Sequence, residues 1–86
     1  MIRVKILSIR DSERYVLRRI VQTVQTELER EFPDLQLEIS EISDPGQIGS
    51  YARVIVLPTL VVNEKVVCSR RMPNREEVAT WLRQAL

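Results

Sequence analysis

The sequence predicts an α/β domain with the element order β-α-β-α-β-β-α. Apolar residues switch between the two-residue period of strands and the 3.6-residue period of helices along the chain. Two β-branched runs near residue 60 are separated by only two residues, which is typical of a hairpin. The length of 86 residues accommodates one modest core. We therefore expect a single domain over residues 1–86, with a four-stranded mixed sheet flanked by three helices.

The longest predicted element is a helix from Glu13 through about Phe32. Asp11 or Ser12 is the expected N-cap, because a short side-chain oxygen can accept from the free N–H groups of the first turn. An apolar stripe at helical spacing is expected to face the sheet. It consists of Leu17, Ile20, Val21, Val24 and Leu28.

Strands are predicted on both sides of this helix, over residues 3–9 and 35–40. A right-handed crossover through the helix makes these two strands parallel. Ile42 is out of phase with the second strand, so we expect that strand to end or bulge near Ser40.

A short second helix is expected to begin at Asp44, because an N-cap type residue is followed by proline at the first helical position. The third strand is expected to begin at Thr59, since Pro58 is tolerated only at the start of a strand. The sequence Asn63–Glu64 then separates it from a fourth strand over residues 65–69.

The last predicted helix opens with a capping box from Asn74 to Glu77. Its apolar stripe is formed by Val78, Trp81, Leu82 and Ala85.

Composition excludes several classes of function. Thirteen basic residues nearly balance twelve acidic ones, so no overall field attracts nucleic acid or anionic lipid. No apolar run is long enough to span a bilayer, and the N-terminus does not resemble a signal peptide. Cys68 is the only cysteine and histidine is absent, which argues against a disulfide framework and a zinc site. We expect no cofactor. We expect a cytoplasmic protein without nucleic-acid or membrane partners.

The element order, the segment Val54–Leu60 leading into the hairpin and the segment Pro73–Glu77 opening the last helix resemble the thioredoxin fold. More specifically, the chain is similar to the short thioredoxin/glutaredoxin-like redox-active disulfide proteins. In that family a C-x-x-C motif precedes the first helix, but the matching positions Asp11–Arg14 hold no cysteine. Dithiol exchange needs an attacking and a resolving thiol, so we expect no oxidoreductase activity of this kind. Asp11 is interpreted as a helix cap.

Pro58 matches the cis-proline of that family. The resemblance implies that the backbone of the preceding residue, Leu57, is free to pair with an extended peptide. The alternative is that the bend at Pro58 serves folding alone. The hairpin turn of the family is usually Asn-Gly, and Glu64 in place of glycine disfavours positive φ. A looser hairpin loop is therefore expected.

Four arginines are expected to gather where the first, third and fourth strands meet, because antiparallel neighbours reverse direction. This arginine corner comprises Arg10, Arg14, Arg70 and Arg71. A helix N-terminus with arginines suits a carboxylate, a phosphate or an acidic peptide. The alternative is a set of solvated ion pairs with nearby carboxylates. Those considered are Asp11, Glu13, Asp44 and Glu76.

Two residues near the corner carry further expectations. Arg14 falls at the margin of the sheet-facing stripe, so its guanidinium must reach solvent or meet a carboxylate. Cys68 is interpreted either as a small buried hydrophobe or as a thiol whose pKa is lowered by neighbouring arginines.

The functional hypothesis is a thioredoxin-like domain without dithiol chemistry that binds a protein or an anion. Its predicted binding residues are Leu57, Pro58, Arg10, Asp11, Arg14, Arg70 and Arg71. A single-cysteine redox protein acting through Cys68 is one alternative. A structural homo-oligomer is another, for example a homodimer formed through the edge of the fourth strand.

Overall fold

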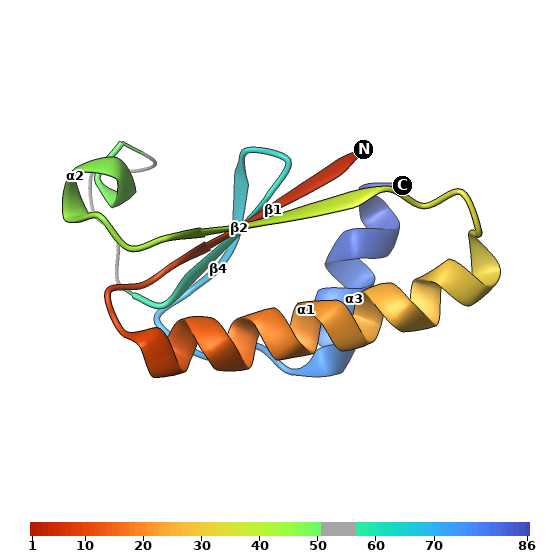
Figure 1. Ribbon diagram of the computed structural model, residues 1–86, viewed down its shortest axis with the longest axis horizontal. Coiled ribbons are helices and arrows are strands. Elements are labelled where there is room, and N and C mark those ends of the chain that lie inside the picture. The colour runs from red at the N-terminus through yellow and green to blue at the C-terminus, as the bar shows by residue number, and fades with distance from the viewer. Residues whose placement is uncertain (51–56) are drawn as a thin grey trace.

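The computed structural model of the chain describes residues 1–50 and 57–86, so residues 54–56 of the segment 54–60 lie outside the described residues. The elements follow the predicted order (Figure 1). The strands are β1 (Ile2–Leu7), β2 (Leu37–Ile42), β3 (Thr59–Val62) and β4 (Lys65–Ser69). The helices are α1 (Asp11–Glu31), α2 (Pro45–Ile48) and α3 (Arg75–Gln84). The predicted α/β class with a four-stranded mixed sheet is confirmed.

The strand order across the sheet is β2-β1-β3-β4, so β2 and β4 form its edges. β1 runs parallel to β2 and antiparallel to β3, and β4 runs antiparallel to β3. Leu7, at the end of β1, is paired with Thr59 at the start of β3. Thr59 is in turn paired with Ser69, at the end of β4. Three chain segments therefore meet at one end of the sheet, as the sequence predicts.

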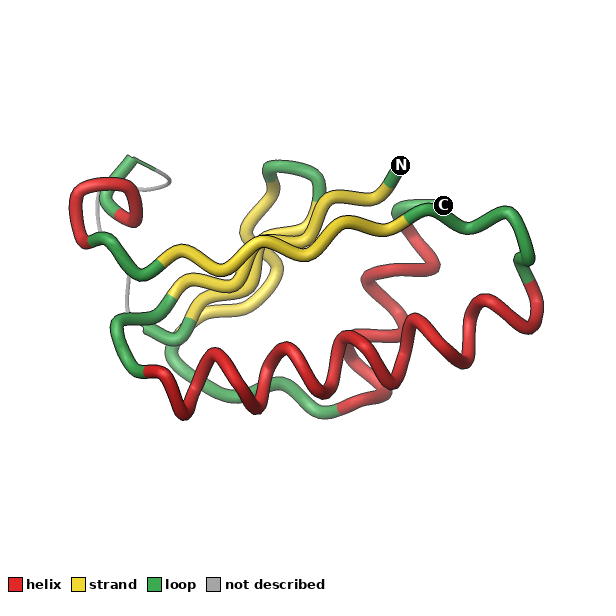
Figure 2. The backbone as a smooth tube through the Cα atoms, in the orientation of Figure 1, coloured by secondary structure: helices red, strands yellow, loops and turns green. Residues whose placement is uncertain are grey.

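The helices occupy two places around the sheet. α1 and α3 lie together on one side, whereas α2 lies at one end of the sheet (Figure 2). The larger core fills the space between the sheet and the α1–α3 layer. A smaller cluster lies on the opposite face, where Ile48 of α2 packs with Leu7 and Val61. Within the described residues, none of the helices combines the length and apolar character that a membrane span requires.

The apolar stripe of α1 is confirmed. Leu17, Val21, Val24 and Leu28 are all buried in the larger core, and Ile20 packs partly buried against it. The N-cap of α1, however, is Arg10 and not Asp11 or Ser12, and its side chain makes no capping hydrogen bond. The helix begins one residue earlier than a cap at Asp11 would allow. The prediction that Asp11 caps the helix is therefore wrong.

Both early strands end at different positions from those predicted. β1 stops at Leu7, and Ile9 beyond it is 60% exposed. β2 continues without a bulge to Ile42, which is paired with Leu7. The expected break near Ser40 is absent because Ile42 belongs to the other face of β2, where it packs against the smaller cluster. Ile42 is out of phase with Leu37 and Ile39 because its side chain lies on the other face of the sheet.

The hairpin turn is tight, contrary to prediction. Asn63 and Glu64 both adopt positive φ, at 49° and 66°, as a two-residue turn requires. Asn63 Oδ1 accepts the Arg3 N–H at 2.9 Å, and Glu64 forms an ion pair with Lys5. Contacts with β1 thus offset the reluctance of glutamate to enter this region of φ.

The β3–β4 pairing contains one irregularity. Val61 is paired with Val66, and the next pair is Leu60 with Cys68. Val67 is therefore an extra residue, a β-bulge in the edge strand.

Both later helices begin with the predicted caps. The Asp44 carboxylate accepts from the Gly46 N–H at 3.1 Å, which caps α2. The capping box of α3 is also present: Asn74 Oδ1 accepts the Glu77 N–H at 2.8 Å, and Glu77 Oε1 accepts the Asn74 N–H at 3.2 Å.

Candidate functional site

The Leu57–Pro58 segment lies at the end of the sheet where β1, β3 and β4 meet. The peptide bond between these two residues is cis. Pro58 is buried, and its carbonyl accepts the Arg70 N–H at 3.2 Å. The Leu57 side chain is half-buried and packs against the smaller cluster. No hydrogen bond joins the Leu57 backbone to another residue in the described part of the chain.

Arg14 is held in place by carboxylates, as predicted for a guanidinium at the margin of the core. Its Nη1 donates to the Ser8 carbonyl at 2.7 Å, and its Nη2 pairs with Asp11. Its Nε lies 3.6 Å from Glu41 Oε1, and Arg18 reaches the other oxygen of Glu41 at 2.7 Å. With only 13% of its side chain exposed, Arg14 links the start of α1 to the end of β2. It is not oriented to receive a ligand.

Arg71 is also engaged by a carboxylate. Its Nη1 and Nη2 donate to the two carboxylate oxygens of Glu77 at 2.8 and 2.5 Å. The Arg71 hydrogen bond, with help from the Asn74 backbone, lowers the pKa of the Glu77 carboxyl to about 2. The same pairing raises the pKa of the Arg71 guanidinium. Arg71 therefore stabilises the first turn of α3.

Arg10 and Arg70 differ from the other two members of the arginine corner. Both are exposed, and within residues 1–50 and 57–86 neither has a carboxylate at ion-pair distance. Arg70 also adopts a φ of 75°, in the left-handed region. The exposed Ile9 directly precedes Arg10 in the loop between β1 and α1. The corner thus presents two cations and an apolar side chain.

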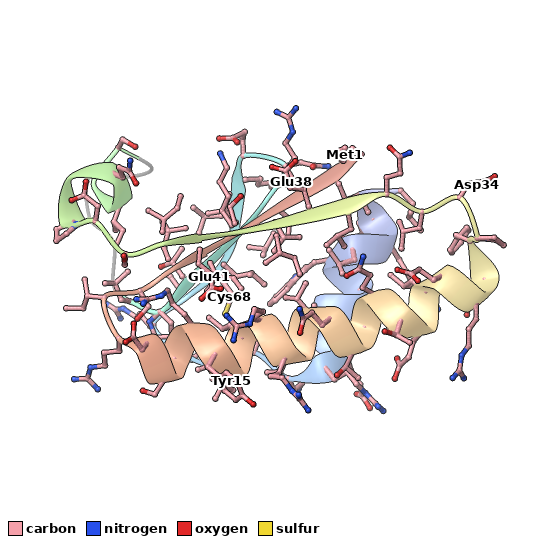
Figure 3. All side chains as sticks on the ribbon, viewed as in Figure 1. Met1, Tyr15, Asp34, Glu38, Glu41 and Cys68 are labelled. Carbon is pink, nitrogen blue, oxygen red and sulfur yellow. The ribbon has the colours of Figure 1, made fainter. Side chains whose placement is uncertain are left out.

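Cys68 belongs to the larger core, as the first of its two interpretations predicts. The residue is 7% exposed, and Figure 3 shows it between the sheet and α1. Its Sγ lies 3.6 Å from the Arg71 carbonyl oxygen. Burial raises the pKa of the thiol, and the nearby Arg71 charge opposes this only in part. Burial and the raised pKa both disfavour nucleophilic chemistry at this residue.

Two carboxylates central to the corner were not predicted as partners of the arginines. Glu41 pairs with Arg14 and Arg18, and Glu77 pairs with Arg71. Of those considered, Glu13 accepts from the Ser8 hydroxyl at 2.7 Å and Asp44 caps α2. A signal for Glu41 was available, because it lies at the end of a strand parallel to β1.

Tyr15, labelled in Figure 3, is 52% exposed on α1 and has Arg18 over its ring.

No group of three or more histidine, cysteine or acidic side chains in the described part of the chain is arranged to hold a metal ion. Among the described residues at this end of the sheet, the Arg10 and Arg70 guanidinium groups have no carboxylate at ion-pair distance and the Leu57 backbone has no hydrogen bond. Such groups recognise anions and extended peptide backbone.

A model of the thioredoxin domain matches residues 14–83 of the chain. The chain therefore belongs to the thioredoxin-domain family. No curated protein sequence matches it.

Two solved structures of human ERp44 resemble the fold, each at 20% sequence identity over 96% of this chain. The zinc-bound form of that protein has a TM-score of 0.60, and crystal form I has a TM-score of 0.57. The aligned regions cover 26% and 24% of those chains, so this chain spans about a quarter of their length. At this identity the resemblance concerns the fold alone.

Proposed function

We propose that this thioredoxin-family domain is a non-redox binding module that docks an extended, acidic peptide segment beside Leu57. The observation that carries the proposal is the Leu57 backbone, which has no hydrogen-bond partner in the described part of the chain. An extended peptide can pair with such a backbone through its own N–H and C=O groups.

The surroundings of Leu57 favour acidic side chains on that peptide. Arg70 is anchored beside the segment by the hydrogen bond from its N–H to the Pro58 carbonyl. Arg10 follows the end of β1, which is next to the start of β3 in the sheet. Neither guanidinium has a carboxylate partner in the described range, so both are free to meet a carboxylate of the ligand. The exposed Ile9 adds an apolar contact.

The chain's thiol content supports a non-redox role. Cys68 is the only cysteine in the sequence, so one chain cannot form the dithiol that disulfide exchange uses. Its burial and its raised pKa argue against the alternative in which a single thiol carries the activity.

A titration of the ¹⁵N-labelled protein with a synthetic pentapeptide that alternates valine and glutamate tests the proposal. We expect saturable shifts of the Ile9, Leu57 and Arg70 amides. Arg70→Gly should weaken binding roughly five-fold, since one exposed ion pair contributes up to about 1 kcal/mol. Arg19→Ala, which removes an exposed arginine from the middle of α1, is the matched control and should leave the affinity unchanged.

Two further arms separate the proposal from its competitors. A peptide with glutamine in place of glutamate should bind more weakly. Equal affinity of the two peptides would show that Arg10 and Arg70 do not contact the ligand. Inorganic phosphate that shifts only Arg10 and Arg70 would indicate a small-anion site instead. Sedimentation equilibrium tests the homo-oligomer alternative, because a dimer that excludes the peptide would overturn the binding role.

A further inference from the structure

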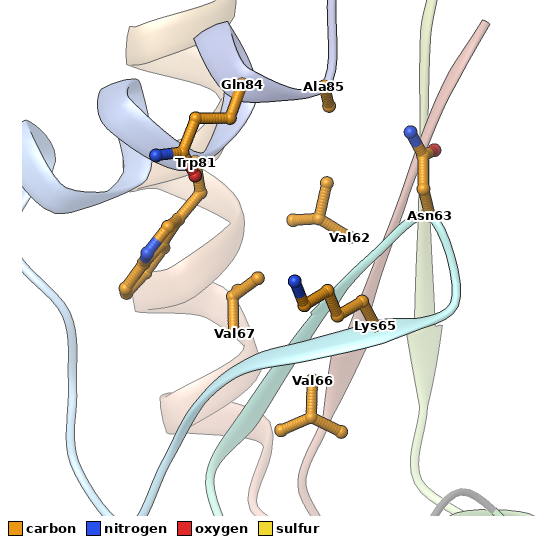
Figure 4. A pocket seen from close by; sticks show the side chains of 8 residues that line it. All are labelled: Val62, Asn63, Lys65, Val66, Val67, Trp81, Gln84 and Ala85. Atoms are coloured by element: carbon orange, nitrogen blue, oxygen red, sulfur yellow. The ribbon is translucent and has the colours of Figure 1, made fainter.

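A concave surface lies at the other end of the sheet from the arginine corner. It is an open groove of about 440 Å³ between the β3–β4 hairpin and α3 (Figure 4). Its walls come from residues 62–67 on the hairpin and from residues 81–85 at the end of α3. The groove falls within the size range of small-molecule sites, which is about 300–1,000 Å³. We refer to it below as the hairpin–α3 groove.

The floor and one side of this groove are apolar. Trp81 contributes its ring from α3, and Val62 and Val67 contribute branched side chains from β3 and β4 (Figure 4). Val66 is paired with Val61 of the smaller cluster, so its side chain lies on the other face of the sheet. Trp81 and Val67 are both partly buried against the larger core, so the fold holds them in place. An aromatic ligand can stack on such an indole and contact the valines.

A cation lies at the opposite side of the groove. The Lys65 side chain extends into the hairpin–α3 groove from the start of β4, and the Gln84 side chain lies beside Trp81 at the rim (Figure 4). Within the described ranges, Lys65 has no carboxylate at ion-pair distance. An apolar floor with one unpaired ammonium is complementary to a molecule with an apolar body and one carboxylate.

The edge strand itself argues for a compact ligand over an added β-strand. β4 has no strand neighbour on its outer side among the described elements, which exposes it to strand addition. The bulge at Val67 interrupts its regular spacing, and Lys65 places a charge on it. Both features are typical devices against pairing with another chain. A second copy or an extended peptide is therefore disfavoured as the occupant.

We infer that the hairpin–α3 groove binds a small carboxylate with an aromatic body. The ring lies against Trp81 and Val67, and the carboxylate accepts a hydrogen bond from the Lys65 ammonium. This site is independent of the peptide-docking proposal, because no residue of the groove lies in the Leu57–Pro58 segment or the arginine corner.

The single tryptophan of the chain makes this inference directly measurable, because Trp81 is the only indole fluorophore and it lies in the groove. The probes are phenylpropionate, phenylpropanol and phenylpropylamine, which share one body and differ in charge. We expect phenylpropionate to change Trp81 fluorescence saturably and to shift the Val62 and Val67 NMR signals. It should bind more tightly than the alcohol, and the amine should bind least tightly.

Three variants test the contacts. Lys65→Met keeps most of the stem but removes the charge, and should weaken phenylpropionate about five-fold while leaving phenylpropanol unchanged. Arg19→Met removes the same charge from the exposed surface of α1 and should alter neither ligand. Val67→Ala should weaken both ligands, because Val67 lies in the groove on the same side of β4 as Trp81 (Figure 4).

The inference is overturned if the alcohol binds as tightly as the carboxylate, or if Lys65→Met leaves phenylpropionate binding unchanged. NMR shifts confined to Leu57 and Arg70 would also overturn it, because they would place the ligand at the arginine corner. These outcomes leave the peptide-docking proposal unaffected.

Discussion

At the scale of single residues, Cys68 shows how placement governs chemistry. The residue lies in the larger core with Leu60 and Val78, and burial raises the pKa of its thiol. The neighbouring Arg71 would lower that pKa in an exposed site, but its guanidinium is engaged by Glu77. The sequence places an arginine near the thiol, but it does not show whether burial or the arginine charge has the larger effect on the thiol pKa.

The first prediction concerns the reactivity of this thiol. Iodoacetamide should label Cys68 slowly in the native protein at neutral pH and rapidly after unfolding in urea, because the thiolate is both scarce and enclosed. Intact-mass spectrometry measures the rate across a range of pH. Rapid labelling of the native protein at neutral pH would contradict the core placement and favour a redox role.

The second prediction follows from the backbone of Arg70. Its φ of 75° is unfavourable for a residue with a Cβ atom. Arg70→Gly should therefore raise the free energy of unfolding by about 1 kcal/mol, measured by urea denaturation. Arg70→Ala removes the same guanidinium but keeps the Cβ atom, so it should give no such gain. Equal stability of the two variants would contradict this explanation.

Arg14 marks the limit of sequence reasoning at this scale. Its position on the helix predicts that it must reach solvent or meet a carboxylate, and it meets Asp11 and Glu41. The order of the elements places the end of β2 near the start of α1, but it does not show which side chain of β2 faces Arg14. Helical periodicity therefore predicts the need for a partner but does not identify it.

At the scale of elements, the hairpin turn shows local preference overridden by tertiary contacts. Glutamate alone disfavours the φ of 66° that Glu64 adopts. The Lys5–Glu64 ion pair and the hydrogen bond between Arg3 and Asn63 connect the turn to β1. These partners are about 60 positions away in sequence, so local propensity could not reveal them. The end of β2 at Ile42 is hard to predict for a related reason. The alternating pattern of apolar residues follows one face of the strand, whereas Ile42 packs on the other face.

The third prediction concerns the start of α3. Arg71 and the Asn74 backbone hold the pKa of Glu77 at about 2, below its ordinary value of 4.5. A carboxyl whose pKa is lowered by folding contributes stability above its unfolded pKa and loses that contribution as the pH falls toward the folded value. The free energy of unfolding should therefore fall as the pH is lowered from 4.5 to about 2, and Glu77→Gln should make this fall smaller.

A carboxyl ¹³C titration measures the Glu77 pKa directly. Arg71→Met removes the largest cause of the shift and should move the pKa upward toward 4.5. Arg75→Met is a matched control, because Arg75 pairs with Glu27 and not with Glu77. An unchanged pKa in Arg71→Met would contradict the assigned cause.

At the scale of the whole molecule, the two faces of the sheet contribute unequally. In the described residues, the larger core includes side chains from α1, α3 and all four strands, whereas the smaller cluster centres on Leu7, Ile48 and Val61. The alternating apolar pattern predicted the larger core well. The ion pairs between helices are harder to predict from the sequence. Glu27 pairs with Arg75 and Glu31 with Arg83, and both contacts depend on how α1 and α3 lie against each other.

The fourth prediction compares the two clusters. Leu82→Ala should lower the free energy of unfolding by about 3 kcal/mol or more, because the side chain is fully buried between α3 and the sheet. Ile48→Ala should cost less, about 2 kcal/mol, because the smaller cluster offers fewer packing partners. Urea denaturation measures both values. A larger loss from Ile48→Ala would mean that the α2 face dominates stability.

The strand order has a consequence for the time course of protein synthesis. β1 is made first but lies inside the sheet, and one of its two edges is covered by β3. A ribosome must therefore release some sixty residues before β1 acquires its second neighbour, and Val78 and Leu82 of the core emerge later still. The nascent N-terminal half exposes an apolar strand edge during that interval, when it is most open to aggregation. The domain can therefore complete its fold only after α3 has been translated.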